Sequence, residues 1–269
     1  MKKIIKKIAK PIAKPILSWL RVVGINLFSI SNVRFIPKYF SQFREFKKLG
    51  GKITYASPKL TEWAEQAGSA SGHYFHQDLL VASFIFERQP RRHIDIGSRI
   101  DGFVAHVATF RPIEIIDIRS LSSTGHDNIS FLQMDLMNVA NDQAELADSI
   151  SCLHAIEHFG LGRYGDPLNP NGHVIGFNNI LKMLKPNGLL YISFPIAYRN
   201  EVHFNEQRVF HPQDILSWTN SSSHIELERF DYVDDSGNLI KNANAHTISA
   251  DLVYGCGIYT FRKLAISNG

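Results

Sequence analysis

Short apolar segments alternate with helical patterns and turns along most of the chain after residue 72. Seven of these segments have the length, bulky apolar residues and flanking turn residues that are typical of strands. They comprise residues 93–96, 113–118, 129–134, 149–153, 189–194, 225–233 and 252–264. Helical patterns lie at about 75–88 and 174–184, which predicts an α/β fold with a doubly wound sheet. No clear crossover helix joins the last two strands, so we expect a mixed sheet whose last strand is antiparallel.

The first strand, turn, helix and second strand are predicted between Arg92 and Arg119. Gly97 begins the turn and Gly102 ends it, and a glycine lets the backbone approach a ligand closely. Asp117 follows roughly 20 residues later, where a carboxylate can accept hydrogen bonds from ribose hydroxyls. The turn lacks the middle glycine of the dinucleotide pattern G-x-G-x-x-G. An ordinary turn that binds no ligand is therefore the alternative interpretation.

The N-terminal segment, residues 1–36, interleaves lysines with isoleucine, leucine and tryptophan. Such a basic amphipathic segment can lie on an anionic membrane surface. A helix that packs on the main domain with its lysines in water is an equally good interpretation. Two early prolines argue against a signal peptide, and polar residues among its apolar positions argue against a membrane-spanning helix.

The remaining composition is that of a cytoplasmic globular protein. The chain has 269 residues, of which 44% are hydrophobic, and a formal net charge of +4. Because many of the lysines are in the N-terminal segment, we expect no nucleic-acid-binding surface on the rest. Cys152 and Cys256 match neither a zinc spacing nor a disulfide framework, which predicts buried, reduced thiols.

We divide the chain into three parts. Residues 1–36 form the basic segment, 37–72 a linker and cap region with glycine-rich loops, and 73–269 the main domain. The oligomeric state does not follow from the sequence.

Ionisable residues cluster directly after the fourth predicted strand. The segment 153–173, LHAIEHFGLGRYGDPLNPNGH, also contains four glycines. Open α/β sheets place their sites in such loops at the carboxyl ends of strands. A self-hydrogen-bonded surface turn is the alternative for the Gly-Arg-Tyr-Gly-Asp-Pro part. The candidate residues here are His154, Glu157, His158, Arg163, Tyr164 and Asp166, with His203, Asn205 and Arg208 after the fifth strand.

Five features, in this order along residues 75–264, resemble the class I S-adenosylmethionine-dependent methyltransferases. They are Asp95-Ile-Gly97, Asp117, Asp135, Ile156-Glu157-His158 and Leu184-Lys-Pro-Asn-Gly188-Leu. The segment EHFGLGRYGDPLNPNG resembles, more narrowly, an uncharacterised bacterial family of methyltransferase-like proteins, a domain of unknown function. The resemblance implies a Rossmann-like, seven-stranded mixed sheet and S-adenosylmethionine as cofactor.

The resemblance also implies roles for individual residues. Asp95 and Gly97 would contact the methionine and ribose part of the cofactor, with Ser98 and Gly102 in the same turn. Asp117 would bind the ribose hydroxyls, Asp135 the adenine amino group, and Leu136 the adenine ring. Arg99 departs from the family, which usually has a small residue there; it could point to solvent, pair with Asp101 or fill part of the cofactor site.

Methyl transfer needs an acceptor nucleophile held in line with the methyl group, and often a base that removes its proton. His158 is the first candidate for this base, because imidazole titrates near neutral pH. His154, Glu157 and His203 are second candidates. The acceptor pocket is predicted to contain Arg163, Tyr164, Asp166, Asn205 and Arg208. We expect no metal, because the sequence contains neither His-Glu-x-x-His nor paired cysteines.

The sequence thus leaves three classes of function open. The first is a methyltransferase that acts on a sugar, a glycan precursor or another small molecule; bacterial surface polysaccharide biosynthesis is one setting. The basic N-terminal segment would suit an acceptor at the inner face of a membrane. The second is a non-catalytic binding protein that keeps the fold. The third, a nucleotide-dependent oxidoreductase or epimerase, is disfavoured by the missing glycine and the lack of a Tyr-x-x-x-Lys pair.

Overall fold

The computed structural model describes residues 32–60, 62–64, 67–219, 225–248 and 251–265. The chain divides into two compact units, Met1–Gly68 and Ser69–Gly269. Most of the predicted basic segment 1–36 lies outside the described residues. None of the helices in the described part of the chain is long and apolar enough to cross a membrane.

The described part of the first unit contains one α-helix, α2 (Ile36–Lys48), and a short 3₁₀ helix, Glu62–Ala64. Pro37 occupies the first turn of α2, where its missing N–H costs no hydrogen bond, and two lysines occupy the last turn. No side chain of α2 is buried among the described residues. The sequence analysis assigned these residues to a linker and did not predict the helix, although Ile36, Tyr39, Phe40 and Phe43 recur at helical spacing.

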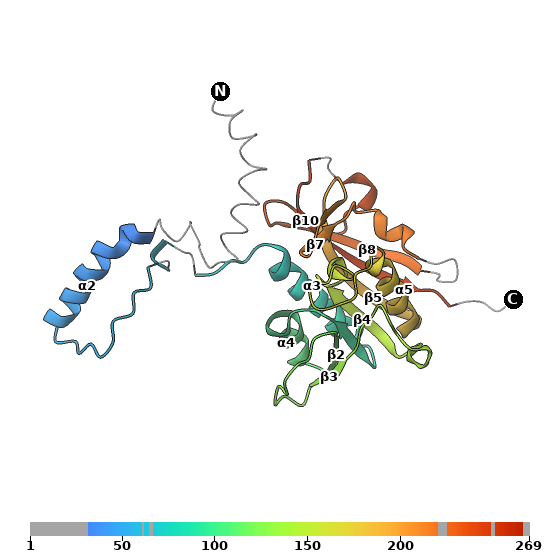
Figure 1. Cartoon of the computed structure of the whole chain (residues 1–269), viewed down its shortest axis with the longest axis horizontal. Coiled ribbons are helices and arrows are strands. Elements are labelled where there is room, and N and C mark those ends of the chain that lie inside the picture. The colour runs from blue at the N-terminus through green and yellow to red at the C-terminus, as the bar shows by residue number, and fades with distance from the viewer. Residues whose placement is uncertain (1–31, 61, 65–66, 220–224, 249–250, 266–269) are drawn as a thin grey trace, which may run out of the picture. The chain divides into compact units, whose positions relative to one another are not determined.

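The second unit is built on one sheet, in which the structure describes eight strands (Figure 1). They are β1 (His93–Ile96), β2 (Ile113–Asp117), β3 (Ile129–Gln133), β4 (Ala147–Leu153), β5 (Leu184–Ile196), β8 (Ile225–Val233), β9 (Leu239–Ile240) and β10 (Gly255–Lys263). Their order is β3-β2-β1-β4-β5-β10-β8-β9. Strands β1 to β5 pair in parallel, whereas β10 runs antiparallel to β5 and β8. The predicted fold class is therefore confirmed, and the extra strand β9 is a two-residue edge strand.

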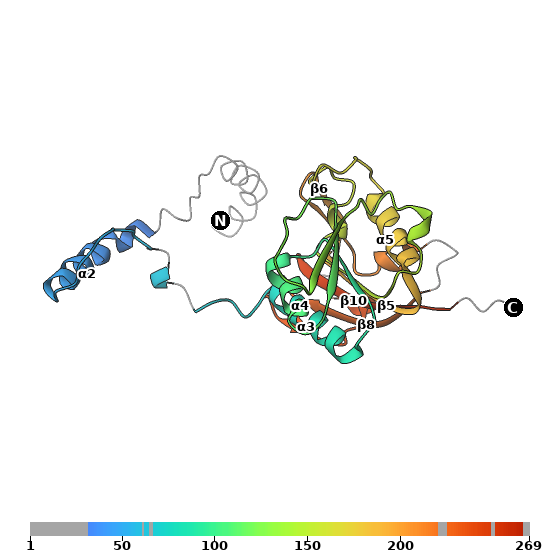
Figure 2. The same ribbon diagram turned by 90° about the horizontal axis from the view of Figure 1, so that it is seen from below.

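Helices cover both faces of the sheet (Figure 2). On one face lies α5 (Gly172–Met183). On the other lie α3 (His73–Arg88), a π-helical turn (Ile100–Val104) and α4 (Ala105–Ala108). All four residues of β1 are buried, as expected for a strand covered on both faces.

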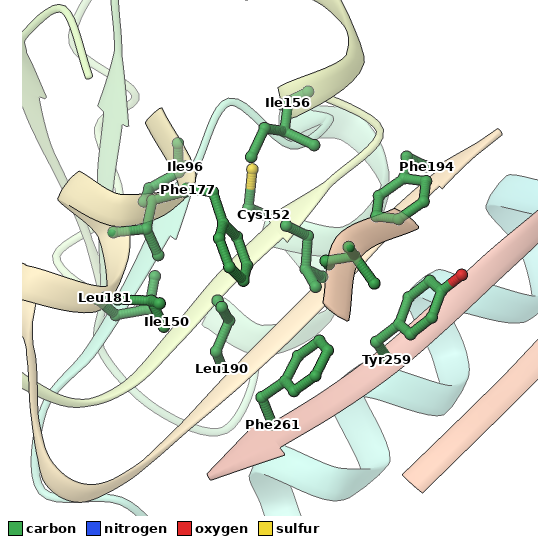
Figure 3. Packing of buried hydrophobic residues seen from close by; sticks show 14 of the residues in the cluster. Ile96, Ile150, Cys152, Ile156, Phe177, Leu181, Leu190, Phe194, Tyr259 and Phe261 are labelled. Carbon is green, nitrogen blue, oxygen red and sulfur yellow. The ribbon is translucent and has the colours of Figure 1, made fainter. Parts of the chain in front are cut away.

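Alternate residues of the central strands contribute to the two cores. Ile150 and Cys152 of β4 pack under Phe177 of α5, together with Leu190 and Phe194 of β5 (Figure 3). Tyr191, between them in sequence, packs on the opposite face. Because successive side chains of a strand point to opposite faces, an uninterrupted apolar run supplies both cores.

The connections contain short elements that the sequence did not fully predict. Strands β6 (Glu201–His203) and β7 (Gln207–Val209) form a separate hairpin after β5. Short 3₁₀ helices lie at Asn141–Gln143, Ile156–His158, Asp214–Ser217 and Ala245–Thr247. Strand β5 begins at Leu184, so the predicted turn at 185–188 belongs to the strand segment.

Candidate functional site

Two adjoining hollows lie where β1, β2 and β4 end. Six residues line both of them: Gly97, Asp117, Arg119, His154, His158 and Tyr164. The sheet order reverses between β1 and β4, because β1 connects to β2 on one side and β4 leads to β5 on the other. Ligands of open α/β sheets bind at such a switch point, at the carboxyl ends of the strands. We call the two hollows together the cleft.

The turn after β1 brings backbone to the cleft. Gly97 has a φ of +65°, and a Cβ there would lie 3.0 Å from the Cβ of Ala155. Asp95 is fully buried beneath the turn and accepts hydrogen bonds from the amide and hydroxyl of Ser98 and from the Ser151 hydroxyl. Burial raises the pKa of Asp95 to about 6, although these bonds oppose the shift. Asp95 thus holds the turn in shape and does not itself line the cleft.

The other two predicted residues of this turn have different places. Ser98 lines the second hollow, and its hydroxyl also accepts the amide proton of Leu153 at 3.1 Å. Gly102 lies in the π-helical turn and lines neither hollow of the described structure. A Cβ on Gly102 would lie 2.6 Å from Oδ2 of Asp78, so this glycine permits helix packing.

Asp117, at the end of β2, is held by an arginine that the sequence analysis did not select. Arg119 donates from Nε to Oδ1 at 3.0 Å and from its terminal nitrogen to Oδ2 at 2.6 Å. These hydrogen bonds to the Asp117 carboxylate raise the pKa of Arg119. The guanidinium also lies 4.3 Å from the ring centre of Tyr164. A bidentate pair with aromatic stacking fixes both side chains at the cleft.

The first hollow is mostly apolar. Asp135 lines it and accepts the amide proton of Met137 at 2.9 Å, while Leu136 is buried in its wall. Asp135 and Leu136 therefore line the first hollow together with Gly97 and Asp117. The apolar lining comes from Ile96, Ile116, Ile118, Met134, Leu136, Met137 and Phe159.

His158 faces the cleft in a form suited to accept a proton. Its Nδ1 lies 2.7 Å from the carbonyl oxygen of Glu206, which requires that Nδ1 carry the proton and leaves the lone pair on Nε2. Burial lowers the pKa of His158, although Glu157 opposes the shift. The imidazole is consequently neutral at neutral pH.

His154 differs from His158 in its charge. Its Nδ1 lies 2.8 Å from Oε1 of Glu157, a fully buried carboxylate. Burial alone would lower the pKa of His154, but Cys256 and Glu157 together hold it well above the usual value. The backbone of His154 has a φ of +52°, an uncommon conformation for a residue with a side chain. His154 is thus a less effective base than His158.

The loop after β4 is organised by Asp166. Its carboxylate accepts backbone protons from Gly160, Gly162 and Tyr164. This is the self-hydrogen-bonded turn considered as the alternative, although Asp166 also lines the first hollow. Arg163 lines the second hollow and donates to the carbonyl of Glu206 at 2.9 Å.

The residues predicted after β5 do not join this group. His203 pairs with Glu201 on the exposed hairpin, and Asn205 occupies the hairpin turn with a φ of +63°. Arg208 is buried and donates to the carbonyls of Glu157, Phe159, Asn169 and Pro170. None of the three lines either hollow in the described structure; Glu206 and Gln207 of the same hairpin line the second. The guanidinium of Arg208 therefore supports the loop.

Arg99, which departs from the family pattern, lies at the rim. It pairs with Asp101 at 3.3 Å, and its side chain is 48% exposed. It also lies 4.9 Å from the ring centre of Tyr74 and lines the second hollow with it. Arg99 thus pairs with Asp101, which is one of the three expected arrangements, and its side chain is half exposed.

One family model matches part of the sequence. A family model described as "Caenorhabditis protein of unknown function, DUF268" matches residues 112–216. No curated protein matches the sequence.

Solved structures with a similar arrangement include a 1,6-didemethyltoxoflavin-N1-methyltransferase from Burkholderia thailandensis, which contains 1,6-didemethyltoxoflavin and S-adenosylhomocysteine. It is 13% identical, with a TM-score of 0.49, over 84% of this chain and 87% of that one. The N-methyltransferase NodS from Bradyrhizobium japonicum WM9 is 15% identical, with a TM-score of 0.44, over 71% and 88%. The [4+2]-cyclase SpnF is 16% identical, with a TM-score of 0.49, over 70% and 82%. At such identities the activity of this chain has to follow from its own cleft.

Proposed function

We propose that the chain binds S-adenosylmethionine in the cleft and transfers its methyl group to a hydroxyl of a sugar, a glycan precursor or another small molecule. One observation carries the proposal. Gly97 after β1, Asp117 after β2 and Asp135 with Leu136 after β3 all line the same hollow. The topology of a parallel sheet brings these turns to one edge, and the choice of a glycine, two carboxylates and apolar residues at that edge suits a nucleoside.

The lining suits the parts of this cofactor. The apolar first hollow fits the adenine ring, with Asp135 at its edge as an acceptor for the amino group. Asp117 fits the ribose hydroxyls, provided that they share its carboxylate with Arg119. Gly97 leaves room where a Cβ would narrow the junction of the two hollows. The polar second hollow, with Ser98, would then hold the methionine part.

The cofactor supplies an electrophilic methyl group on its sulfonium, and the chain supplies the base and the acceptor site. His158 would take the acceptor proton on Nε2, while the Glu206 carbonyl holds Nδ1–H and fixes the ring. Tyr164 packs edge-on against this ring, with centroids 5.6 Å apart. Arg163, Tyr164 and Gln207 offer hydrogen bonds to a hydroxyl-rich acceptor in the second hollow.

One observation favours the non-catalytic alternative. The carboxylate of Asp117 is already neutralised by Arg119, and Tyr164 lies over that guanidinium. If the pair does not open, ribose hydroxyls cannot reach Asp117. The chain would then keep the fold for binding or assembly without this cofactor.

Calorimetry with the full chain separates these functions. We expect one-to-one binding of S-adenosylhomocysteine and S-adenosylmethionine and no binding of nicotinamide dinucleotides. Transfer of labelled methyl groups to a panel of sugar nucleotides and lipid-linked sugars then tests the reaction. Binding without transfer to any acceptor would favour the non-catalytic alternative, and binding of a nicotinamide cofactor alone would favour an oxidoreductase. Binding of neither class of cofactor would refute the proposal.

A further inference from the structure

Three side chains with soft or borderline donor atoms meet beside the cleft. His73 comes from the first turn of α3, His154 follows β4, and Cys256 lies in β10. One donor atom from each lies within 4.8 Å of the other two. The rings of His73 and His154 are also stacked, with centroids 5.3 Å apart. Residues separated by up to 183 positions are thus gathered at one point of the sheet edge.

His154 is held in the orientation that a metal ligand needs. Nδ1 of His154 lies 2.8 Å from Oε1 of Glu157 and keeps its proton there, so a metal at Nε2 would displace the second proton of the charged ring. Metal-binding histidines usually donate their second ring nitrogen to a carboxylate or a backbone carbonyl in this manner. The ring of His73 stacks on that of Tyr254, with centroids 5.3 Å apart.

A buried nitrogen in this cluster lacks a partner. The His154 side chain is 5% exposed, and its Nε2 has no hydrogen-bond partner among the described residues. Oε2 of Glu157 behind it also lacks one. A buried polar atom without a partner destabilises the folded chain, so these atoms call for an explanation. A cation on Nε2 would satisfy the nitrogen and offset the charge of Glu157.

We infer that His73, His154 and Cys256 bind a divalent transition metal of the zinc class, with Glu157 as the carboxylate that orients His154. Two imidazoles and a thiolate suit zinc or cobalt, whereas magnesium and calcium prefer oxygen ligands. Three protein ligands leave a fourth position for water or substrate, as in catalytic zinc sites. Because His154 lines both hollows, this position lies next to the cleft.

Binding requires a small contraction of the cluster. Ligand atoms around tetrahedral zinc lie roughly 3.3 to 3.8 Å apart, given bonds of about 2.0 to 2.3 Å. His73 is only partly buried and can rotate toward the other two. Sγ of Cys256 now lies 3.6 Å from Oε1 of Gln77, which also accepts from the Ser193 hydroxyl at 2.6 Å. Gln77 therefore keeps a partner when the thiol loses its proton to become a ligand.

This site does not depend on methyl transfer, because it rests on other side chains and on a different chemistry. The metal would tie the start of α3 to the ends of β4 and β10 at the wall of the cleft. It would contribute to stability even if the cleft bound no S-adenosylmethionine.

Cobalt binding to the full chain provides the first test. The protein is stripped of metal with a chelator and titrated with Co²⁺, then with Zn²⁺. We expect one equivalent of cobalt, the visible bands of a tetrahedral site and a thiolate-to-cobalt charge-transfer band, all displaced by zinc. A folded chain that gives no charge-transfer band with stoichiometric cobalt would overturn the inference.

Matched variants identify the ligands. Cys256→Ala should remove the charge-transfer band, whereas Cys152→Ala should keep it, because that equally buried thiol lies outside the cluster. His73→Gln should weaken cobalt binding, whereas His76→Gln on the same helix should not. Glu157→Gln should weaken it by about 10- to 100-fold. Circular dichroism checks that each variant folds. If Cys256→Ala does not fold, the presence or absence of the charge-transfer band in the wild-type chain decides whether the thiol is a ligand.

Other outcomes would assign the cluster differently. Unchanged cobalt affinity in Cys256→Ala and His73→Gln would show that the metal binds elsewhere and overturn the inference. Failure to bind cobalt or zinc, together with rapid alkylation of Cys256 by iodoacetamide, would overturn it in favour of a reactive thiol paired with His154.

Discussion

At the scale of single residues, the cleft separates side chains that face a ligand from side chains that shape the loops. Asp117, Tyr164 and His158 line both hollows. Asp95 and Arg208 have the right chemistry for a site, but their hydrogen bonds go to the protein itself. The type of a residue indicates which groups its side chain can bind. Its contacts within the protein decide whether its polar atoms are available to a ligand.

Replacement of Asp117 by alanine tests the cofactor site. We expect the affinity for S-adenosylhomocysteine to fall by about 1 to 3 kcal/mol, because the ribose hydroxyls lose their acceptor. Calorimetry measures the change, and Asp127→Ala, at an exposed position of the following connection, is the control. Equal affinities of wild type and Asp117→Ala would show that the carboxylate serves Arg119 alone.

Replacement of His158 by alanine tests the base. Turnover should fall by roughly 10²- to 10⁴-fold while the affinity for S-adenosylhomocysteine stays the same. Because burial lowers the pKa of His158, the wild-type rate should fall only when the pH drops below the ordinary range of histidine. His203→Ala on the exposed hairpin should keep wild-type turnover. Loss of turnover and affinity together in His158→Ala would indicate a structural histidine.

At the scale of elements, the pairing of β1 with β4 contains a polar contact inside an apolar core. His93 is fully buried and lies between the hydroxyls of Ser149 and Ser151, at 2.8 and 3.1 Å. Burial lowers the pKa of His93 to about 3. The neutral ring can form hydrogen bonds with both hydroxyls. A protonated ring would instead place an unpaired charge in the interior, which destabilises the fold.

His93 should therefore make the domain sensitive to acid. Its folded pKa lies below the unfolded value, so the unfolded chain takes up a proton first and stability is lost as the pH falls below about 6.5. Between pH 7 and about 4.5, His93→Gln should lose roughly 2 to 3 kcal/mol less free energy of unfolding than wild type. Urea titrations at both pH values measure this difference. The exposed His126→Gln is the control, and an equal loss in wild type and His93→Gln would contradict the assignment.

At the scale of the whole molecule, the described sheet accounts for the second unit alone. The lysine-rich start of the chain lies outside the described residues, and its role stays a prediction from the sequence. Its charge would bring the cleft close to acceptors at an anionic surface.

Replacement of Lys2, Lys3, Lys6, Lys7, Lys10 and Lys14 by glutamine tests this role. Binding to vesicles that contain anionic lipid should weaken by about 1 kcal/mol for each lysine near the surface. Flotation of the two proteins with anionic and with neutral vesicles measures the effect. Equal partitioning of wild type and variant would show that these lysines face solvent and do not bind the membrane.

The elements of the second unit could be predicted wherever a strand or helix has a buried face. Strands β1 and β8 begin and end at the predicted residues, because β1 is a short buried run and β8 alternates apolar with polar residues. Helix α2 and the β6–β7 hairpin were not predicted. The apolar positions of α2 lie among glycine-rich loops and were assigned to a linker, and the two strands of the hairpin have only three residues each, too few for a recognisable pattern.

The site was predictable in part for a similar reason. Residues directly after parallel strands share one edge of the sheet, so Gly97, Asp117, Asp135 and His158 could be grouped from the sequence alone. Arg119, which pairs with Asp117, and Glu206, whose carbonyl bonds to His158, could not be identified, because residue spacing does not reveal such contacts. Cys256 reaches His154 only because β10 enters the sheet antiparallel beside β5.

The sequence by itself thus determined the alternation of strands and helices and the edge at which the ionisable residues collect. Both follow from local patterns of burial and from the direction of each strand. The tertiary structure decided which of those side chains are available to a ligand. Arg208 donates to backbone carbonyls and Asp117 pairs with Arg119, and the fold also brings His73 close to Cys256. Such contacts join residues far apart in sequence, and their geometry depends on packing that no local pattern contains.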